Sequence, residues 1–252
     1  MSKNSSNAVE ANGDRRVDDA FVKFPRTPHL FWLGRIPPRA DKVLSAVEAT
    51  EMLRRPVALE EKVDGACIGI SLLPTGRLRV QNRGSYLDQN SHPQFRLLWQ
   101  WLTRHEQGLR SVLTPARILF GEWCYAQHTV CYDALPDWFL AFDVYDRQSR
   151  RFWSRERRNE LAQHVGVATV PFLGTGTFDR ATLEKQFSQS KLGHEPMEGL
   201  YLRWDEGPWL VARAKLVRAS WVEFDEEHWS KRPLRANHCR PDIDFQQDRD
   251  HQ

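Results

Sequence analysis

Apolar and polar residues alternate along several short segments in the first half of the chain. Residues 57–61 and 66–73 have the pattern of two strands separated by Gly65, and residues 77–82 alternate as a return strand. The intervening residues 74–76 have the turn sequence Pro-Thr-Gly. The pattern therefore predicts a β-hairpin with one further strand before it.

Longer apolar and aromatic runs follow in the second half of the chain. Residues 118–125 and 138–145 have the composition of buried strands. Residues 199–204 and 209–217 flank the sequence Asp-Glu-Gly-Pro at 205–208, which is typical of a hairpin turn. A second hairpin is therefore expected near the end of the chain.

Helical spacing occurs in four places. Residues 93–105 carry apolar side chains at i, i+3, i+4 and i+7, which predicts an amphipathic helix, and residues 155–164 predict a second. Asp179 is a suitable N-cap for a third helix that would include Phe187. Residues 221–229 predict a last helix.

Strands predominate and do not alternate regularly with helices. This favours an α+β domain, with antiparallel sheets flanked by helices, over a doubly wound parallel sheet. Residues 1–20 are polar with no apolar period, so we expect a disordered N-terminal arm. We expect one domain over residues 21–232, followed by a polar, flexible tail at 233–252.

Charge and composition narrow the class of protein. The chain has 252 residues, and 36 Lys and Arg against 33 Asp and Glu give a net charge of +3, which excludes a highly basic nucleic-acid coat and an acidic disordered chain. No apolar run approaches the roughly 18 residues of a membrane span, and the first residues lack a secretory signal. A cytoplasmic protein without membrane partners is the expectation.

The four cysteines form no C-x-x-C pair. Cys124, His128 and Cys131 lie close in sequence, so a metal site there is one interpretation. Reduced, partly buried thiols are the alternative.

The sequence Glu-Glu-Lys-Val-Asp-Gly-Ala at residues 60–66 is the strongest candidate for chemistry. Lys62 is a candidate nucleophile, because an amine whose pKa is lowered by neighbouring cations or by partial desolvation can attack an electrophile. Gly65 would allow the backbone to approach a nucleotide closely. The alternative is a strand and turn at the surface with a solvated lysine.

Other short motifs follow in a fixed order, and they favour a nucleophilic Lys62 over a solvated surface lysine. Together with Lys62-x-Asp64-Gly65, they resemble motifs I to V of the covalent nucleotidyltransferases, which include ATP-dependent DNA and RNA ligases and mRNA capping enzymes. The set most resembles ATP-dependent RNA ligases of the bacteriophage RNA ligase 2 type, which implies the nucleotidyltransferase fold. The further motifs are Asn82-Arg83-Gly84, Phe120-Gly121-Glu122-Trp123, Phe139 to Tyr145, Glu198 to Arg203, and Arg213-Ala214-Lys215-Leu216-Val217.

The resemblance implies a role for each motif residue. Lys62 would attack the α-phosphate of ATP and retain AMP. Arg213 and Lys215 alternate along a strand and so share a face, where they would neutralise the phosphate and lower the pKa of Lys62. Glu198 would help to hold Mg²⁺, with Mn²⁺ also suitable. The nucleoside and phosphate contacts implied are Glu61 and Val63 (adenine, through the backbone), Phe142 (adenine stacking), Glu122 (ribose) and Arg83 (ribose or phosphate, later the RNA 5′-phosphate).

Two positions depart from the RNA ligase 2 pattern. Arg213 replaces the usual Lys, and Arg keeps the positive charge. Cys67 replaces an Asn, and a thiol is a weak hydrogen-bond donor, so no phosphate contact is assigned to it. Only 37 residues follow Lys215, so no C-terminal OB domain is expected after motif V.

Residues 147–158 are rich in arginine and include Phe152 and Trp153. Arginine with aromatic residues suits phosphate contact and base stacking. The alternative is a helix with many salt bridges, since Asp146, Glu156 and Glu160 lie nearby.

The resulting hypothesis is an ATP-dependent RNA ligase. It would join 3′-hydroxyl and 5′-phosphate RNA ends, in a nicked duplex or a broken stem-loop, through lysyl-AMP and an adenylylated 5′ end. RNA repair, with a separate end-healing kinase or phosphatase, is the implied setting. The alternatives are a ligase for DNA or DNA/RNA hybrid nicks, a GTP-using capping enzyme, and a non-catalytic RNA-end-binding repair accessory.

Overall fold

The computed structural model describes residues 20–35, 42–223 and 233–241, and within them ten strands form two sheets. The first sheet is antiparallel and has the strand order β10–β9–β1–β8. Its strands are β1 (Val57–Lys62), β8 (Phe172–Gly176), β9 (Gly199–Glu206) and β10 (Trp209–Val217).

The second sheet has the order β3–β2–β4–β5–β6, with β7 paired in parallel to β5. Its strands are β2 (Ala66–Leu72), β3 (Leu78–Gln81), β4 (Arg117–Trp123), β5 (Phe139–Asp146), β6 (Arg151–Phe152) and β7 (Ala168–Thr169). The two sheets confirm the predicted α+β class, in which antiparallel pairing dominates.

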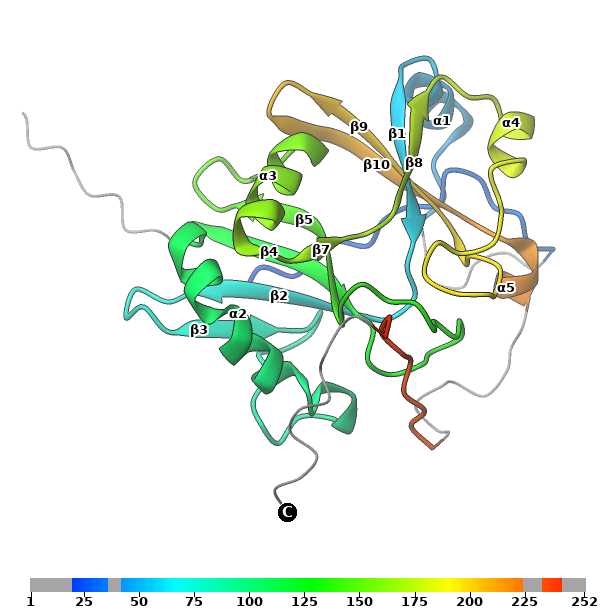
Figure 1. The fold of residues 1–252 in the computed structure, drawn as a ribbon. Helices are drawn as coiled ribbons and strands as arrows, with labels where there is room; N and C mark the ends of the chain where they lie inside the picture. Colours follow the sequence, from blue (N-terminus) through cyan, green and yellow to red (C-terminus); the bar gives the residue numbers. More distant parts are fainter. Residues whose placement is uncertain (1–19, 36–41, 224–232, 242–252) are drawn as a thin grey trace, which may run out of the picture.

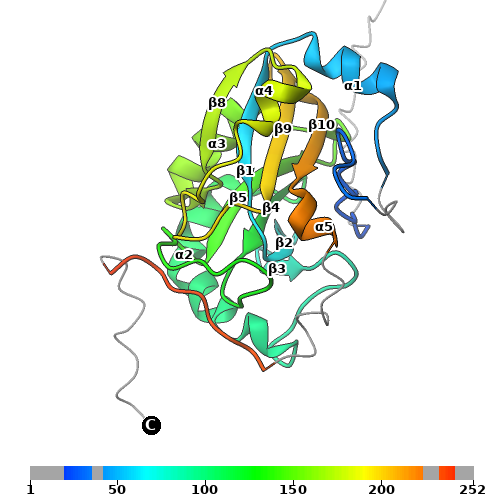
Figure 2. The same cartoon turned by 90° about the vertical axis from the view of Figure 1, so that its right-hand side faces the viewer.

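Helices cover the sheets from outside. The helices α2 and α3 lie together against the second sheet, whereas α1 and α4 lie at the first sheet (Figures 1 and 2). The helices are α1 (Ala46–Leu53), η1 (Pro93–Phe95, a 3-10 turn), α2 (Leu98–Val112), α3 (Arg155–Val165), α4 (Arg180–Glu184) and α5 (Ala219–Glu223).

The two larger of three apolar clusters among the described residues hold these layers together. Alternation along β2 buries Ile68 and Ile70 beneath α2, which contributes Leu98 and Trp101. The core of the first sheet contains Leu59, Leu200, Leu202 and Leu216, covered by Met52 of α1 and Leu183 of α4. Each such side chain contributes about 1.5–3 kcal/mol on burial, so the amphipathic pattern accounts for the layering.

The chain passes from one sheet to the other through the Lys62 motif. β1 ends at Lys62 in the first sheet, and β2 begins at Ala66 in the second. At Gly65 a Cβ atom would lie 2.7 Å from the backbone oxygen of Trp123, so only glycine allows the two strands to approach this closely. The motif thus lies where the two sheets meet.

Both predicted hairpins are confirmed. β2 and β3 pair around the turn that contains Gly76 (φ +80°), and β9 and β10 pair around Gly207 (φ +54°). The helix α3 begins after Ser154, whose side chain accepts a hydrogen bond from Arg157 N, and ends at the left-handed Gly166 (φ +78°).

The other predicted helices differ from the structure in length. The helix expected over 93–105 is a 3-10 turn at 93–95 followed by α2, which continues to Val112. Asp179 caps α4 as expected, but α4 ends at Glu184, so Phe187 lies beyond it. α5 covers 219–223, and the rest of the expected helix at 221–229 lies outside the described residues.

The ends of the chain are described only in part. The expected N-terminal arm, up to residue 19, and residues 242–252 lie outside the described residues. Residues 233–241 differ from the expected flexible tail, because Asn237 is buried and bonded to the loop at 124–135. Among the described residues, no helix has both the length and the apolar character to cross a membrane.

Candidate active site

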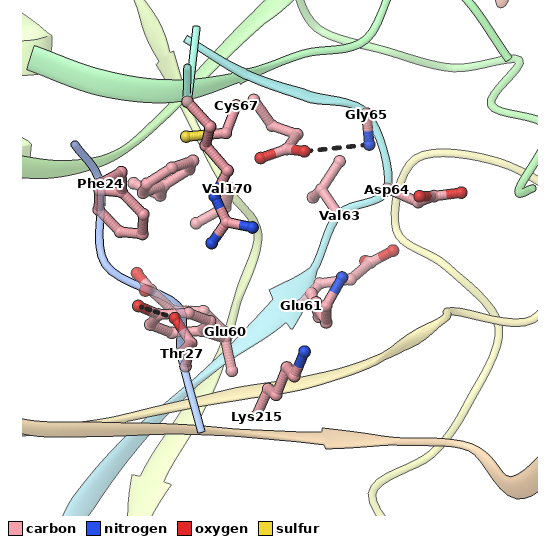
Figure 3. Close-up of a pocket in the computed structure, with 15 residues that line it drawn as sticks. Phe24, Thr27, Glu60, Glu61, Val63, Asp64, Gly65, Cys67, Val170 and Lys215 are labelled. Carbon is pink, nitrogen blue, oxygen red and sulfur yellow. Dashed lines mark hydrogen bonds between the residues drawn. The ribbon is translucent and has the colours of Figure 1, made fainter. Parts of the chain in front are cut away.

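A cavity of about 270 Å³ lies between the sheets at the Lys62 motif (Figure 3). The chain folds so that β1, β10, the N-terminal segment and the second sheet all contribute to its walls. Seven of the predicted site residues line it: Glu61, Lys62, Val63, Arg83, Glu122, Phe142 and Lys215.

Strand register brings Lys62 to Glu198, although 136 residues separate them. In the antiparallel pair β1–β9, Lys62 lies opposite Gly199, the residue after Glu198. The Lys62 Nζ to Glu198 Oε2 distance is 2.5 Å, and the Lys62 side chain is 22% exposed. The amine is therefore held at the wall of the cavity, within reach of a ligand.

The charges around Lys62 differ from the prediction. Burial by itself lowers the pKa of the Lys62 amine, but the charges of Glu198 and Asp64 outweigh burial, so its pKa is raised. The expectation that Arg213 and Lys215 lower this pKa is wrong for the ligand-free protein. Lys62 is a cation here and must lose a proton before it can act as a nucleophile.

Two half-buried carboxylates lie near Lys62: Glu122 lines the cavity, whereas Glu198 contacts the amine without lining it. Glu122 of β4 accepts a hydrogen bond from Gly65 N at 3.1 Å. Burial raises the pKa of Glu122 to about 8, against the opposing charge of Lys62. Burial likewise raises the pKa of Glu198 to about 7. Both carboxyl groups therefore retain a proton to higher pH than exposed glutamates do.

These carboxylates fit a divalent cation. Carboxylate oxygens are the hard donors that Mg²⁺ and Mn²⁺ bind, and Glu122 and Glu198 both lie near Lys62. Within the described part of the chain, no group of three or more His, Cys, Asp or Glu side chains forms a metal cage. Magnesium commonly keeps several waters and uses substrate phosphates, so a single protein carboxylate suffices for this type of site.

Asp64 positions the loop at 124–135. Its Oδ2 accepts hydrogen bonds from Thr129 N at 2.7 Å and Val130 N at 3.1 Å. Its own N–H donates to Tyr132 Oη at 2.8 Å. The Asp of the motif therefore holds an adjacent loop as well as contributing charge near Lys62.

An aromatic wall forms the opposite side of the cavity. Phe142 contacts Phe24 edge to face, with ring centroids 5.1 Å apart, and Val170 and Tyr201 also line this side. Figure 3 shows Phe24 and Thr27 on the N-terminal segment, facing the cavity. This segment is fixed beside β10 by the bonds Lys215 N to Pro28 O (2.9 Å) and Leu30 N to Lys215 O (2.8 Å).

Sequence reasoning missed Phe24, Thr27, Val170 and Tyr201. The first two follow the polar arm in the segment Phe-Val-Lys-Phe-Pro-Arg-Thr-Pro-His-Leu-Phe-Trp, which starts at residue 21. Its aromatic residues were a signal of a packed segment. Tyr201 lies within the motif from Glu198 to Arg203, although no role was assigned to it, and Val170 carries no sequence signal; only the tertiary arrangement brings both to the cavity.

The two cations of β10, Arg213 and Lys215, have different surroundings in the structure. Lys215 extends from β10 into the cavity (Figure 3). Arg213 instead donates a hydrogen bond to Asp143 Oδ2 at 2.5 Å and stacks over Phe152 at 4.0 Å. Arg203 binds the other oxygen of Asp143 at 2.6 Å. The structure thus brings Lys215, but not Arg213, to the cavity.

Glu61 and Val63 frame the Lys62 backbone. The Glu61 carboxylate accepts hydrogen bonds from Ser190 Oγ at 2.5 Å and from Lys191 N at 2.9 Å, so its side chain is engaged with a neighbouring loop. Val63 is buried and lines the cavity. A backbone contact of these residues with adenine stays a prediction.

Arg83 lies at a second, open groove that adjoins the cavity. It donates a hydrogen bond to Pro25 O at 3.3 Å. The groove, of about 440 Å³, shares Arg83 and Cys67 with the cavity and is also lined by Asn82, Gly84, Ser85 and Gln94. Burial raises the pKa of the Cys67 thiol, which keeps this position neutral.

The arginine-rich segment serves mainly as structure. Arg158 is fully buried and donates to Glu60 Oε1 at 2.5 Å, and Arg155 Nε lies 3.3 Å from the same oxygen. Arg157 stacks over Trp153 at 3.7 Å. Arg155 and Arg158 thus form internal salt bridges, with Glu60 rather than with the nearby Asp146, Glu156 or Glu160 that the sequence suggested, and Arg157 packs on an aromatic ring.

Comparisons with known proteins agree with this arrangement. A family model described as RNA ligase matches residues 55–217. Naegleria gruberi RNA ligase with ATP and Mn superposes with a TM-score of 0.59 at 17% identity, over 79% of this chain and 63% of that one. A structure of the same enzyme with AMP and Mn gives 0.55 at 16% identity, over 80% and 63%.

These similarities at low identity support the fold, and the chain spans less than two thirds of the length of the Naegleria enzyme in these structures. No match was found among curated protein sequences. The family model covers well over half of the chain, including Lys62, Glu122, Glu198 and Lys215. On this match, together with the fold and the cavity, the chain belongs to the RNA ligase family.

Proposed function

We propose that this chain is an ATP-dependent RNA ligase that joins a 3′-hydroxyl and a 5′-phosphate RNA end through a lysyl-AMP intermediate on Lys62. The observation that carries the proposal is the position of the Lys62 amine, 2.5 Å from Glu198 at the wall of a cavity that also contains Glu122 and Lys215. We assign the adenylation domain to residues 21–232 and propose a role in RNA repair.

In the first step, Lys62 Nζ attacks the α-phosphorus of ATP. A P–N bond forms, the bond from the α-phosphorus to the bridging oxygen of pyrophosphate breaks, and the amine loses a proton. Lys215 supplies positive charge to the phosphate oxygens as negative charge develops on the leaving group. Because Glu198 holds the amine in its cationic form, the proton must leave before attack.

The other lining residues orient the nucleoside. Phe142 offers its ring to adenine, and the backbone of Glu61 and Val63 lines the cavity beside Lys62. Glu122 accepts hydrogen bonds from the ribose hydroxyls. The aromatic wall excludes water and fixes the α-phosphate near Lys62, which favours reaction through proximity.

Glu198 would hold a Mg²⁺ or Mn²⁺ ion, with Glu122 adding negative charge at the same cavity. The bound ion supplies charge neutralisation at phosphate oxygens. The Naegleria structures contain Mn with ATP or AMP, which supports this assignment.

Two further transfers complete ligation. AMP moves from Lys62 to the RNA 5′-phosphate, and the 3′-hydroxyl oxygen then attacks that phosphorus while AMP leaves. The open groove that shares Arg83 with the cavity is the proposed place for the 5′-phosphate end. A separate kinase or phosphatase would prepare RNA ends that lack the 5′-phosphate or the 3′-hydroxyl.

The test is transfer of label from α-labelled ATP to the protein in the presence of Mg²⁺. We expect label on the wild type, none on Lys62→Ala, and normal labelling of the control Lys185→Ala, whose side chain is exposed on another element. Equal labelling of Lys62→Ala would refute the proposal. Nicked substrates with ribose or deoxyribose termini then separate RNA ligation from DNA or hybrid ligation, and competition by GTP tests a capping enzyme.

A further inference from the structure

Residues 235–240 lie between the two arms of the loop at 124–135, beside which the red segment runs in Figure 1. On one arm, Gln127 N donates to Arg235 O at 2.8 Å and Asn237 N donates to Tyr125 O at 2.9 Å. On the other arm, His238 N donates to Tyr132 O at 2.8 Å. The segment thus adds a short strand-like piece that ties both arms together.

Asn237 uses its side chain on both arms as well. Its Oδ1 accepts a hydrogen bond from Tyr132 N at 2.9 Å, and its Nδ2 donates to Cys124 O at 2.8 Å and to Ala126 O at 3.4 Å. The residue is 1% exposed. A buried amide with donors and acceptor all engaged fixes the loop much more tightly than the exposed side chain of His238 beside it.

The loop in turn holds the Lys62 motif. Tyr132, fully buried, accepts the N–H of Asp64 with its hydroxyl at 2.8 Å. The Asp64 carboxylate accepts the N–H groups of Thr129 and Val130. A continuous set of hydrogen bonds therefore runs from Asn237 through Tyr132 to Asp64, two residues from the amine.

We propose that residues 235–240 act as a clasp that fixes the loop at 124–135 against the Lys62 motif, with Asn237 as its positioning residue for transfer of adenylate to Lys62. This role rests on the proposed function. Asn237 makes no contact with the cavity, and it acts through Tyr132 and Asp64 on the place of the amine.

The ratio between the rates of two reactions of the enzyme distinguishes a positioning role from a loss of stability, because loss of stability alone does not change this ratio. Lys62 is the nucleophile when the enzyme reacts with ATP, but not when a 3′-hydroxyl attacks an RNA end that already carries adenylate. A displaced motif therefore slows the first reaction more than the second. A general loss of folded protein lowers both by the same factor.

The experiment compares full-length wild type, Asn237→Ala, Tyr132→Phe and the control His238→Ala. Two rates are measured: label uptake at saturating α-labelled ATP with Mg²⁺, and sealing of a pre-adenylylated RNA nick without ATP. We expect Asn237→Ala to lower label uptake by about 10- to 100-fold relative to sealing. His238→Ala, which keeps the backbone bonds of the clasp, should match the wild type in both rates.

Tyr132→Phe removes only the hydroxyl that accepts the Asp64 N–H, and it decides the outcome if Asn237→Ala does not fold. The same split between the two rates is expected for it. Wild-type rates, or equal factors of loss in both reactions, overturn the clasp while leaving ligation intact. A wild type that takes up no label overturns the proposed function, and this role with it.

Discussion

Lys62 lies among carboxylates, and this arrangement determines how its reactivity depends on pH. Because Glu198 and Asp64 raise the pKa of the amine above its ordinary value, the cation predominates near neutral pH. We expect the rate of label uptake at saturating ATP to rise as the pH increases above neutrality. A rate constant that stays level across an alkaline pH series would contradict this.

Glu122 makes the stability of the ligand-free protein depend on pH. Its pKa is about 8 in the folded chain against an ordinary value of 4.5, so the folded state retains a proton that the unfolded state loses. The free energy of unfolding should therefore fall as the pH rises from about 4.5 to about 8.

Glu122→Gln should remove this dependence. The variant should be more stable than the wild type above pH 8, by up to about 5 kcal/mol, and close to it under acidic conditions, because the amide does not ionise. Urea unfolding at both ends of this range measures the difference. Identical pH dependence of the two proteins would show that the pKa of Glu122 is not raised in the folded state.

Buried ion pairs between charged residues of different elements connect the two sheets. Glu60 of β1 is fully buried against Arg158 of α3, and Asp143 of β5 lies between Arg203 and Arg213. Removing one partner of such a pair leaves an uncompensated buried charge, which is more costly than the loss of an exposed pair.

Arg158→Met tests this difference. We expect the free energy of unfolding to fall by about 3–5 kcal/mol, because Glu60 loses its 2.5 Å partner. The control Arg110→Met breaks an exposed pair with Glu106 on α2 and should cost less than about 1 kcal/mol. Similar losses for both variants in denaturant unfolding would argue against a buried pair.

Local patterns predicted much of this arrangement. Turn residues indicated both hairpins, and Gly65 with the order of motifs indicated where Lys62, Glu122 and Lys215 meet. Arg213 does not line the cavity, since sequence alternation gives its face but not its partner, and its contact with phosphate stays a prediction. That partner, Asp143, lies 70 residues away on the other sheet.

Other elements left weaker signals or none. α1 was not predicted, although Ser45 and Glu48 form a capping box before it. β6 and β7 have two residues each, too short for a periodic pattern. The roles of Phe24 and Asn237 depend on long-range packing. The polar composition near both ends of the chain gave no indication of that packing.

The cavity draws on both sheets, so a bound nucleotide should stabilise the whole molecule. In Lys62→Ala, which avoids covalent transfer, ATP with Mg²⁺ at about a hundredfold excess over Kd should add about 2.7 kcal/mol and raise the Tm by roughly 5–10 °C. Thermal unfolding at increasing ATP concentration measures this. GTP at matched concentrations serves as the control, and an equal shift with GTP would contradict adenine selection by the aromatic wall.

Phe24 and Asn237 both lie outside residues 55–217, yet one faces the cavity and the other secures a loop beside it. A minimal fragment limited to residues 55–217 would therefore lack the part of the cavity wall that Phe24 forms. It would also lack the hydrogen bonds that hold the neighbouring loop. Boundaries chosen from the matched region alone would yield a polypeptide with every motif present, but without Phe24 at the cavity and without the hydrogen bonds of Asn237 to the loop at 124–135.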